Sequence, residues 1–144
     1  MATKDDVSEK YLELQMLEQQ LKQVNQQIVN INAQVLELQR IEGNLDDIAK
    51  TKGDTEILVS LGGGVLGKAE LKDNQTVLMN VGANVVVEKD IPSSIEMIKH
   101  QIVQMKDVAM QMEQEFQILA MNSQVLQRDL QEMVSEIKEK NNNN

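Results

Sequence analysis

The sequence predicts an α+β fold in which a long antiparallel coiled-coil hairpin carries two β-hairpins inserted between its helices. Apolar residues repeat with heptad spacing at both ends of the 144-residue chain, and the two heptad segments have nearly equal length. The middle of the chain changes instead to an alternation of period two. Only Tyr11 and Phe116 are aromatic, so a large globular core is not expected.

The first helix is predicted over residues 5–52. Asp5 and Asp6 suit the positive end of its dipole, and Gly53 is a stop signal beyond its last apolar residue. Apolar residues recur at spacings of three and four, as the a and d positions of five heptads do. This seam consists of Val7, Leu14, Leu17, Leu21, Val24, Ile28, Ile31, Val35, Leu38 and Leu45.

Residues 55–90 are predicted to form four short strands arranged as two hairpins. The segment is rich in Val, Thr and Gly, and its apolar side chains alternate with polar ones. Asp73 and Asn74 have the chemistry of a tight two-residue hairpin turn, and residues 82–84 supply another flexible corner. Four short strands expose their edges and lack a facing layer, so other copies are expected to complete a shared sheet.

The second helix is predicted over residues 92–140, with a disordered tail at 141–144. Pro92 cannot lie inside a helix, and Ser93 with Glu96 has the spacing of a capping box, so the helix is expected to start there. Its heptad register is continuous, and only one alanine and one serine place small side chains at seam positions. The seam consists of Ile95, Ile98, Ile102, Met105, Ala109, Met112, Phe116, Leu119, Ser123, Leu126, Leu130, Met133 and Ile137.

Equal arms predict that the chain folds back on itself. In an antiparallel pair Ile48 lies near Ile95, and Leu14 and Leu17 meet residues 126–133 at the other end. Two helices cannot bury the apolar residues that lie off this seam. They form either a contact surface for other molecules or padding for another helix of a bundle. These residues are Tyr11, Leu12, Met16, Ile118, Met121, Val125 and Val134.

Composition excludes several classes of partner. The net charge is −9 and no segment concentrates Lys and Arg, so a nucleic-acid interface is not expected. The chain has no cysteine and a single histidine, His100, so it offers neither disulfides nor a soft-metal site. No apolar run is long enough to span a bilayer, and no secretory leader is recognisable. We therefore expect a cytoplasmic protein without membrane contact.

A glycine-rich stretch matches two phosphate-binding motifs. Gly62, Gly64 and Gly67 satisfy G-x-G-x-x-G, and Gly62 with Gly67 and Lys68 satisfies G-x-x-x-x-G-K. Such motifs work at the start of a helix, whereas an alternating strand is predicted here, and Ala69 stands where a magnesium-binding Ser or Thr is needed. We interpret the glycines as a wide bend between strands. No cofactor is expected, and without a catalytic constellation the chain is not expected to be an enzyme.

The order of elements, together with the segments L-V-S-L-G-G-G-V-L-G-K-A-E-L and V-L-M-N-V-G-A-N-V-V-V-E-K-D-I, resembles the alpha-type subunits of the prefoldin family, most closely the archaeal form. The resemblance implies a hexamer of two alpha and four beta subunits, in which hairpins form a double β-barrel from which coiled coils project. It also implies contact with a second alpha subunit through the hairpins. The distal coiled-coil tips would capture unfolded proteins without ATP and pass them to a group II chaperonin.

The resemblance assigns two sets of residues by position. The expected client-binding residues are Tyr11, Leu12, Leu14, Met16, Leu17, Leu126, Leu130, Met133 and Ile137, joined by the off-seam Val125 and Val134. The expected assembly residues are Ile57, Val59, Leu61, Val77, Met79, Val85 and Val87. The alternative function is a structural or tethering coiled coil whose apolar surplus binds one defined partner helix.

Overall fold

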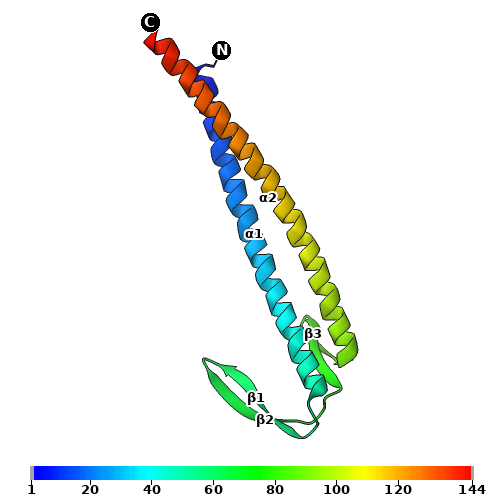
Figure 1. Ribbon diagram of the computed structural model, residues 1–144. Helices are drawn as coiled ribbons and strands as arrows, with labels where there is room; N and C mark the ends of the chain where they lie inside the picture. The colour runs from blue at the N-terminus through cyan, green and yellow to red at the C-terminus, as the bar shows by residue number, and fades with distance from the viewer. Residues whose placement is uncertain (1, 144) are drawn as a thin grey trace. The chain divides into compact units, whose positions relative to one another are not determined.

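The computed structural model describes residues 2–143, and its elements follow the predicted order (Figure 1). Two long helices are joined by two antiparallel β-hairpins, which confirms the predicted fold class. Each sheet has two strands, and no barrel closes within residues 2–143. The elements are α1 (Lys4–Lys50), β1 (Thr55–Gly62), β2 (Val65–Leu71), β3 (Thr76–Gly82), β4 (Val85–Asp90) and α2 (Ile91–Asn142).

Contacts divide the chain into two compact units. The helical unit contains the residues up to Ala33 and those from Lys106 onward, and the hairpin unit is Gln34–Met105. Every predicted seam residue of both helices is buried or half-buried, so the heptad assignment is confirmed throughout. The apolar residues predicted to lie off the seam are all exposed.

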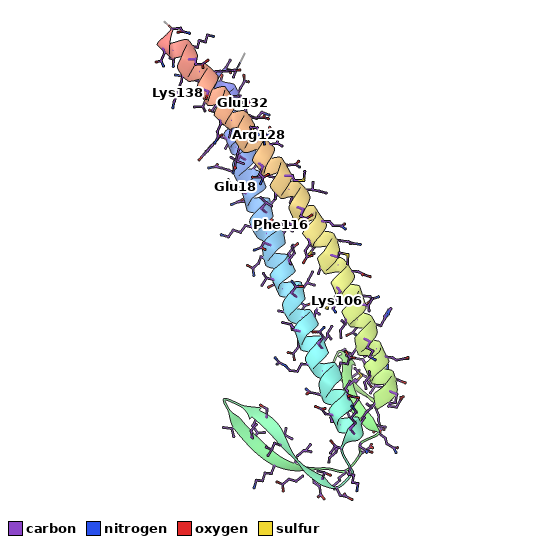
Figure 2. All side chains as sticks on the ribbon, in the orientation of Figure 1. Glu18, Lys106, Phe116, Arg128, Glu132 and Lys138 are labelled. Atoms are coloured by element: carbon purple, nitrogen blue, oxygen red, sulfur yellow. The ribbon has the colours of Figure 1, made fainter. Side chains whose placement is uncertain are left out.

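In the helical unit the two helices pack through seam positions. Leu14 and Leu130 expose only 9 % of their surface, and Ala109 and Ser123 are buried as well. Phe116 is half-buried on α2, whereas the charged Glu18 of α1 and Arg128 of α2 are exposed (Figure 2). Burial of a heptad seam is what stabilises a pair of helices that have no other core.

In the hairpin unit the same seam continues. Val35 and Leu45 of α1 and Ile98 and Ile102 of α2 are buried. Glu42 falls where the heptad spacing of α1 calls for an apolar residue, and its carboxylate lies 3.9 Å from Lys99 Nζ on α2. This contact links the two helices and reduces the cost of a half-buried carboxylate, although so long and exposed a pair contributes little to stability.

The start of α1 is fixed by a reciprocal cap. Thr3 N–H donates to Asp6 Oδ2 at 2.9 Å, and Asp6 N–H donates to Thr3 Oγ1 at 3.2 Å. The Thr3 backbone N–H and hydroxyl stabilise the charged carboxylate and lower the pKa of Asp6 below its ordinary value. The helix therefore begins at Lys4, one residue earlier than predicted.

The start of α2 differs from the prediction. Asp90 rather than Ser93 is the capping residue, because Asp90 Oδ2 accepts the Ser93 N–H at 3.0 Å. Ser94 Oγ donates to the Asp90 carbonyl at 2.8 Å, and Ser94 is fully buried. Pro92 lies in the first turn, where its missing N–H costs no helical hydrogen bond. The predicted capping box of Ser93 and Glu96 is wrong, and the helix begins at Ile91.

The other helix ends also differ from expectation. α1 ends at Lys50, where Thr51 N–H donates to the Ile48 carbonyl at 3.1 Å and tightens the last turn. Gly53 does not supply a left-handed cap, since the positive φ of 63° belongs to Asp54. α2 continues to Asn142, so helix replaces the first residues of the predicted tail at 141–144, whose last residue lies outside the described range.

Both hairpins close with two-residue turns. Gly63 and Gly64 have φ values of 57° and 80°, and Ala83 and Asn84 have 50° and 60°. Positive φ at both central residues is the signature of the type I′ turn, whose twist matches that of the flanking strands. The predicted corner at residues 82–84 is confirmed, whereas the glycines of the first hairpin form a tight turn rather than a wide bend.

The segment between β2 and β3 is a connection and not a hairpin turn, so the prediction for Asp73 and Asn74 is wrong. Asp73 accepts hydrogen bonds from the Thr76 hydroxyl and from the Gln75 N–H, which lower the pKa of its carboxyl. Asn74 Nδ2 donates to the Thr51 carbonyl at 3.0 Å. Asn74 therefore ties the link between the hairpins to the residue that follows α1, while Asp73 bonds within the link and to the start of β3. Asp and Asn also make such side-chain bonds to nearby backbone in true turns, so the local sequence does not distinguish the two cases.

Candidate functional site

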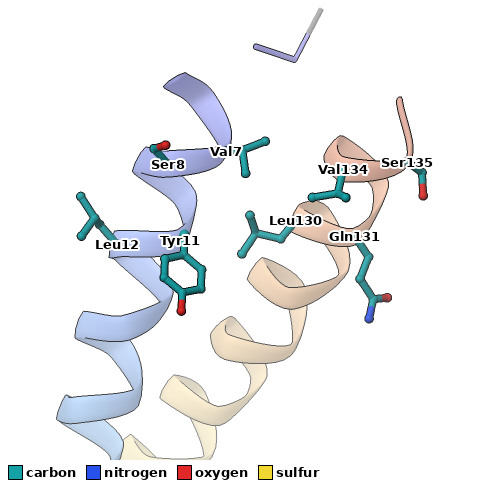
Figure 3. A pocket seen from close by; sticks show the side chains of 8 residues that line it. All are labelled: Val7, Ser8, Tyr11, Leu12, Leu130, Gln131, Val134 and Ser135. Carbon is teal, nitrogen blue, oxygen red and sulfur yellow. The ribbon is translucent and has the colours of Figure 1, made fainter. Parts of the chain in front are cut away.

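The end of the helical unit carries an apolar groove between α1 and α2 (Figure 3). It has a volume of about 890 Å³. Val7 and Tyr11 project from α1 on the side where Leu130 and Val134 project from α2, and among residues 2–143 no charged side chain lines the space. We call it the neutral groove. Its lining residues are Val7, Ser8, Tyr11, Leu12, Leu130, Gln131, Val134 and Ser135.

A second groove runs between the same helices on the opposite flank of the seam. It has a volume of about 500 Å³, and Lys10, Glu13 and Asp129 line it together with apolar side chains. We call it the acidic groove because its carboxylates outnumber its ammonium group. Residues three and four apart on a helix share a stripe, and the two grooves use different stripes of α1. Its lining residues are Lys10, Glu13, Met16, Leu17, Gln20, Asn122, Val125, Leu126 and Asp129.

A third hollow on α1 shares one residue with each groove. It has a volume of about 560 Å³, is lined by α1 alone and includes Leu12 of the neutral groove and Met16 of the acidic groove. Leu12 is 59 % exposed and Met16 is 65 % exposed. The other residues of this hollow are polar or charged, namely Gln15, Glu18, Gln19 and Lys22. Leu12 and Met16 are one helical turn apart and share a face of α1, and we call the apolar side chains of the two grooves, with this pair between them, the apolar band.

The structure brings most of the expected client-binding residues to these grooves. Tyr11, Leu12, Leu130 and Val134 line the neutral groove. Leu14, Met133 and Ile137 line neither groove and belong to the helix seam instead. The remaining four line the acidic groove: Met16, Leu17, Val125 and Leu126.

Sequence reasoning missed the polar residues of both grooves. Ser8 and Gln131 in the neutral groove, and Glu13 and Asp129 in the acidic groove, flank the heptad seam. Their positions beside the seam could have indicated that they border a groove. Which residues of α1 share a groove with which residues of α2 depends on the register of the two helices, and the local sequence does not give that register. Ile118 and Met121 were singled out as surplus apolar residues and are exposed, yet they line neither groove.

The hairpins carry a second large set of exposed apolar side chains. Leu78 is 72 % exposed and Leu61 is 68 % exposed. A patch of such exposed apolar side chains is typical of a protein–protein contact surface. Cross-strand pairing places Val59 opposite Gly67, and a Cβ on Gly67 would lie 3.4 Å from the Leu61 side chain. The exposed set comprises Leu58, Val59, Leu61, Val65, Leu66, Leu78, Val81, Val85, Val86 and Val87.

The expected assembly residues divide into two groups. Val59, Leu61, Val85 and Val87 are exposed. Ile57, Val77 and Met79 are half-buried within the chain itself. The alternation of apolar and polar residues predicted an assembly surface on only one face of each hairpin. Apolar side chains are exposed on the other face as well, namely those of Leu58, Leu66, Leu78 and Val86.

The phosphate motif falls in a hairpin. Gly62 ends β1, Gly63 and Gly64 form the turn, and Gly67 and Lys68 lie in β2, so no helix N-terminus follows the glycines. Within residues 2–143, no cluster of three or more His, Cys, Asp or Glu side chains is placed to hold a metal ion. The helices of the same described range include none that is both long and apolar enough to cross a membrane.

Comparison with known families gives one match that spans most of the chain. A family model described as "Prefoldin subunit" matches residues 17–139. Prefoldin subunit alpha of Archaeoglobus fulgidus is 25 % identical over 130 residues, which cover 90 % of this chain and 95 % of the relative. Prefoldin subunit alpha 1 of Thermococcus kodakarensis is 32 % identical over 66 residues, which cover 46 % of this chain and 45 % of the relative.

A solved structure shares the fold. The cryo-EM structure of filamentous PFD from Methanocaldococcus jannaschii aligns with a TM-score of 0.69 and 16 % sequence identity. The alignment covers 80 % of this chain and 95 % of that one. Similarity at this level of identity establishes the arrangement of helices and hairpins.

Proposed function

Because this chain belongs to the prefoldin family, we propose that it is an ATP-independent chaperone subunit that captures unfolded proteins at the end of its helical unit. The observation that carries the proposal is the apolar band. Unfolded chains differ from folded ones in the apolar side chains that they expose, so an open apolar surface recognises them without a defined sequence.

The chemistry of the band suits varied ligands. The apolar side chains that line both grooves are aliphatic except for Tyr11, and Met16 lines both the third hollow and the acidic groove. Methionine is flexible and polarizable, so it can repack around side chains of different shape. Capture of this kind requires burial of apolar surface and no chemical step, which fits a protein that works without nucleotide.

We assign assembly to the hairpins. A two-stranded hairpin is marginally stable alone, and the exposed set on β1 to β4 would remain in water without partners. In the proposed assembly these strands join a second alpha-type copy and beta-type subunits, two alpha to four beta, in a shared β-barrel. Transfer of the captured protein to a group II chaperonin completes the proposal and rests on the family resemblance.

An aggregation assay tests the proposal. The chain, assembled with a beta-type partner, should slow the aggregation of several unrelated denatured proteins in the absence of nucleotide. Serine at Leu12, Met16, Val125 and Val134 should weaken this activity and leave the assembly intact. A tethering coiled coil would bind one partner and protect none of these proteins, which would contradict the proposal.

A matched control separates the band from general surface apolarity. Ile118 and Met121 are 60 % and 66 % exposed and lie outside both grooves. Serine at these two positions removes an apolar area similar to that removed by serine at Leu12 and Met16 alone, so this pair of double variants is compared. Protection should persist in that control, and equal loss in both variants would mean that the grooves are not the capture site.

A further inference from the structure

The two grooves of the helical unit differ in charge, although apolar side chains line both. Within the described part of the chain, no charged side chain lines the neutral groove. In the acidic groove, Leu17, Val125 and Leu126 line the same space as the carboxylates of Glu13 and Asp129. A ligand segment that enters the acidic groove therefore meets apolar contacts and negative charge together.

The negative charge continues along this flank. Asp6 precedes Glu13 by one heptad, and Glu136 follows Asp129 by one heptad, so each pair occupies the same side of its helix. Asp6 remains charged because its carboxylate accepts the Thr3 N–H. Lys10 is the one basic side chain that lines the acidic groove. Carboxylates thus dominate the charge of the whole flank.

These carboxylates are available to a ligand. Among residues 2–143, neither Glu13 nor Asp129 takes part in a hydrogen bond or an ion pair. Asp129 is half-buried, so water screens its charge less than that of a fully exposed carboxylate. A cation held beside the apolar side chains would pair with these groups without displacing an existing partner.

We propose that the acidic groove selects segments in which aliphatic residues are flanked by Lys or Arg, while the neutral groove accepts aliphatic segments without regard to flanking charge. This inference rests on the proposed function and adds to it a division of substrates between the two flanks of the seam. Long basic side chains suit such a site because their methylene stems pack on apolar surface while their charged ends reach the carboxylates.

The test uses the full-length chain and fluorescent short peptides that share one aliphatic core and carry flanking Lys, Gln or Glu residues. Fluorescence anisotropy should show the Lys peptide binding roughly threefold more tightly than the Gln peptide, and the Glu peptide more weakly still. The difference should shrink as salt is raised, because salt screens the charges of the groove. Equal affinity for the peptides would overturn the inference.

Paired variants locate the preference. Glu13→Gln with Asp129→Asn should abolish the difference between peptides while keeping affinity for the Gln peptide. Asp107→Asn with Glu113→Gln makes the same change in net charge at exposed positions outside both grooves, and it should keep the difference. If both variants lose the preference equally, the net charge of the chain is responsible. If neither loses it, the carboxylates of the acidic groove are not responsible. Either result overturns the inference.

A change of opposite sign completes the test. Lys10→Gln removes the basic side chain from the acidic groove, so it should increase the preference for the Lys peptide. A decrease or no change would contradict the assignment. If the wild-type chain binds none of the peptides, the capture function itself is contradicted. That result is distinct from binding without charge preference, which would leave capture intact and refute only the division between grooves.

Discussion

Asp90 and Ser93 determine where the second long helix begins. The carboxylate of Asp90 accepts the Ser93 N–H at 3.0 Å, and the same residue offers its carbonyl to the buried hydroxyl of Ser94. One aspartate thus ends β4 and starts α2. The strand and the helix are joined without an intervening loop, so the direction of the helix is tied to that of the hairpin.

Replacement of Asp90 should test this junction. Asp90→Ala removes the acceptor for the Ser93 N–H and should lower the melting temperature measured by circular dichroism. Asp90→Asn keeps a side-chain oxygen at the cap and should lie close to the wild type. If alanine and asparagine are equally tolerated, the hydrogen bond does not contribute to the start of the helix.

Acid should destabilise the chain through its capped aspartates. Hydrogen bonds lower the pKa values of Asp6, Asp73 and Asp90 in the folded state below the ordinary value of 3.8. Their contribution is therefore complete above 3.8 and is lost as the pH falls through the lowered folded-state values. Urea midpoints measured across this range should decline with acid, and less steeply in a triple Asp→Asn variant. Equal slopes would refute the prediction.

Leu14 and Leu12 should separate stability from binding. Leu14 is 9 % exposed in the seam, and Leu14→Ala should reduce the free energy of unfolding by about 2–3 kcal/mol, as large-to-small changes in cores do. Leu12 is 59 % exposed, so Leu12→Ala should change that free energy by less than about 0.5 kcal/mol. Urea denaturation measures both. Only Leu12→Ala should weaken the capture of denatured proteins without loss of stability.

Two glycines with open surroundings should respond in opposite directions. No atom lies within 4 Å of a Cβ added at Gly43 or at Gly64, so sterics do not distinguish them. Gly43 is inside α1, where alanine should stabilise the helix by about 1 kcal/mol. Gly64 has a φ of 80° in the first turn, which alanine adopts only with strain, so Gly64→Ala should destabilise. Thermal melts of the two variants measure the contrast.

The exposed hairpin side chains should control assembly. Leu78→Ser and Leu58→Ser remove apolar surface at positions that are 72 % and 61 % exposed. Mass measurement should show a loss of association with a beta-type partner, while circular dichroism retains the helical signal. If these variants assemble normally, the outward faces of the hairpins are not the contact. Glu56→Gln, on the face that carries Leu58, serves as a neutral control.

The seams could be predicted from the sequence because burial follows a single period. Each seam residue, down to Ala109 and Ser123, is buried or half-buried where the heptads require it. Helix boundaries were less accurate, since Ser93 and Asp90 are both good capping residues and tertiary context decides between them. The Asp73–Asn74 pair has the chemistry of a hairpin turn, but Asn74 bonds to Thr51 after α1 and Asp73 accepts the N–H of Gln75 within the link between the hairpins.

The candidate site was only half visible in the sequence. Exposed apolar residues such as Leu12 and Met16 stand out because they break the heptad pattern. The charges of Glu13 and Asp129 look like ordinary solvated residues until the pairing of α1 with α2 brings them to one groove. Their roles depend on two segments that are far apart along the chain, and local spacing carries no information about that distance.

The two hairpins have the same backbone geometry at their turns. Each has a register irregularity before its turn, at Ser60 and Gly62 in one and at Asn80 and Gly82 in the other, and each closes through two residues of positive φ. A neighbouring strand that fits the end of one hairpin meets the same local shape at the other. A single chain thus presents two hairpin ends of equivalent backbone shape, one for each of two different neighbours.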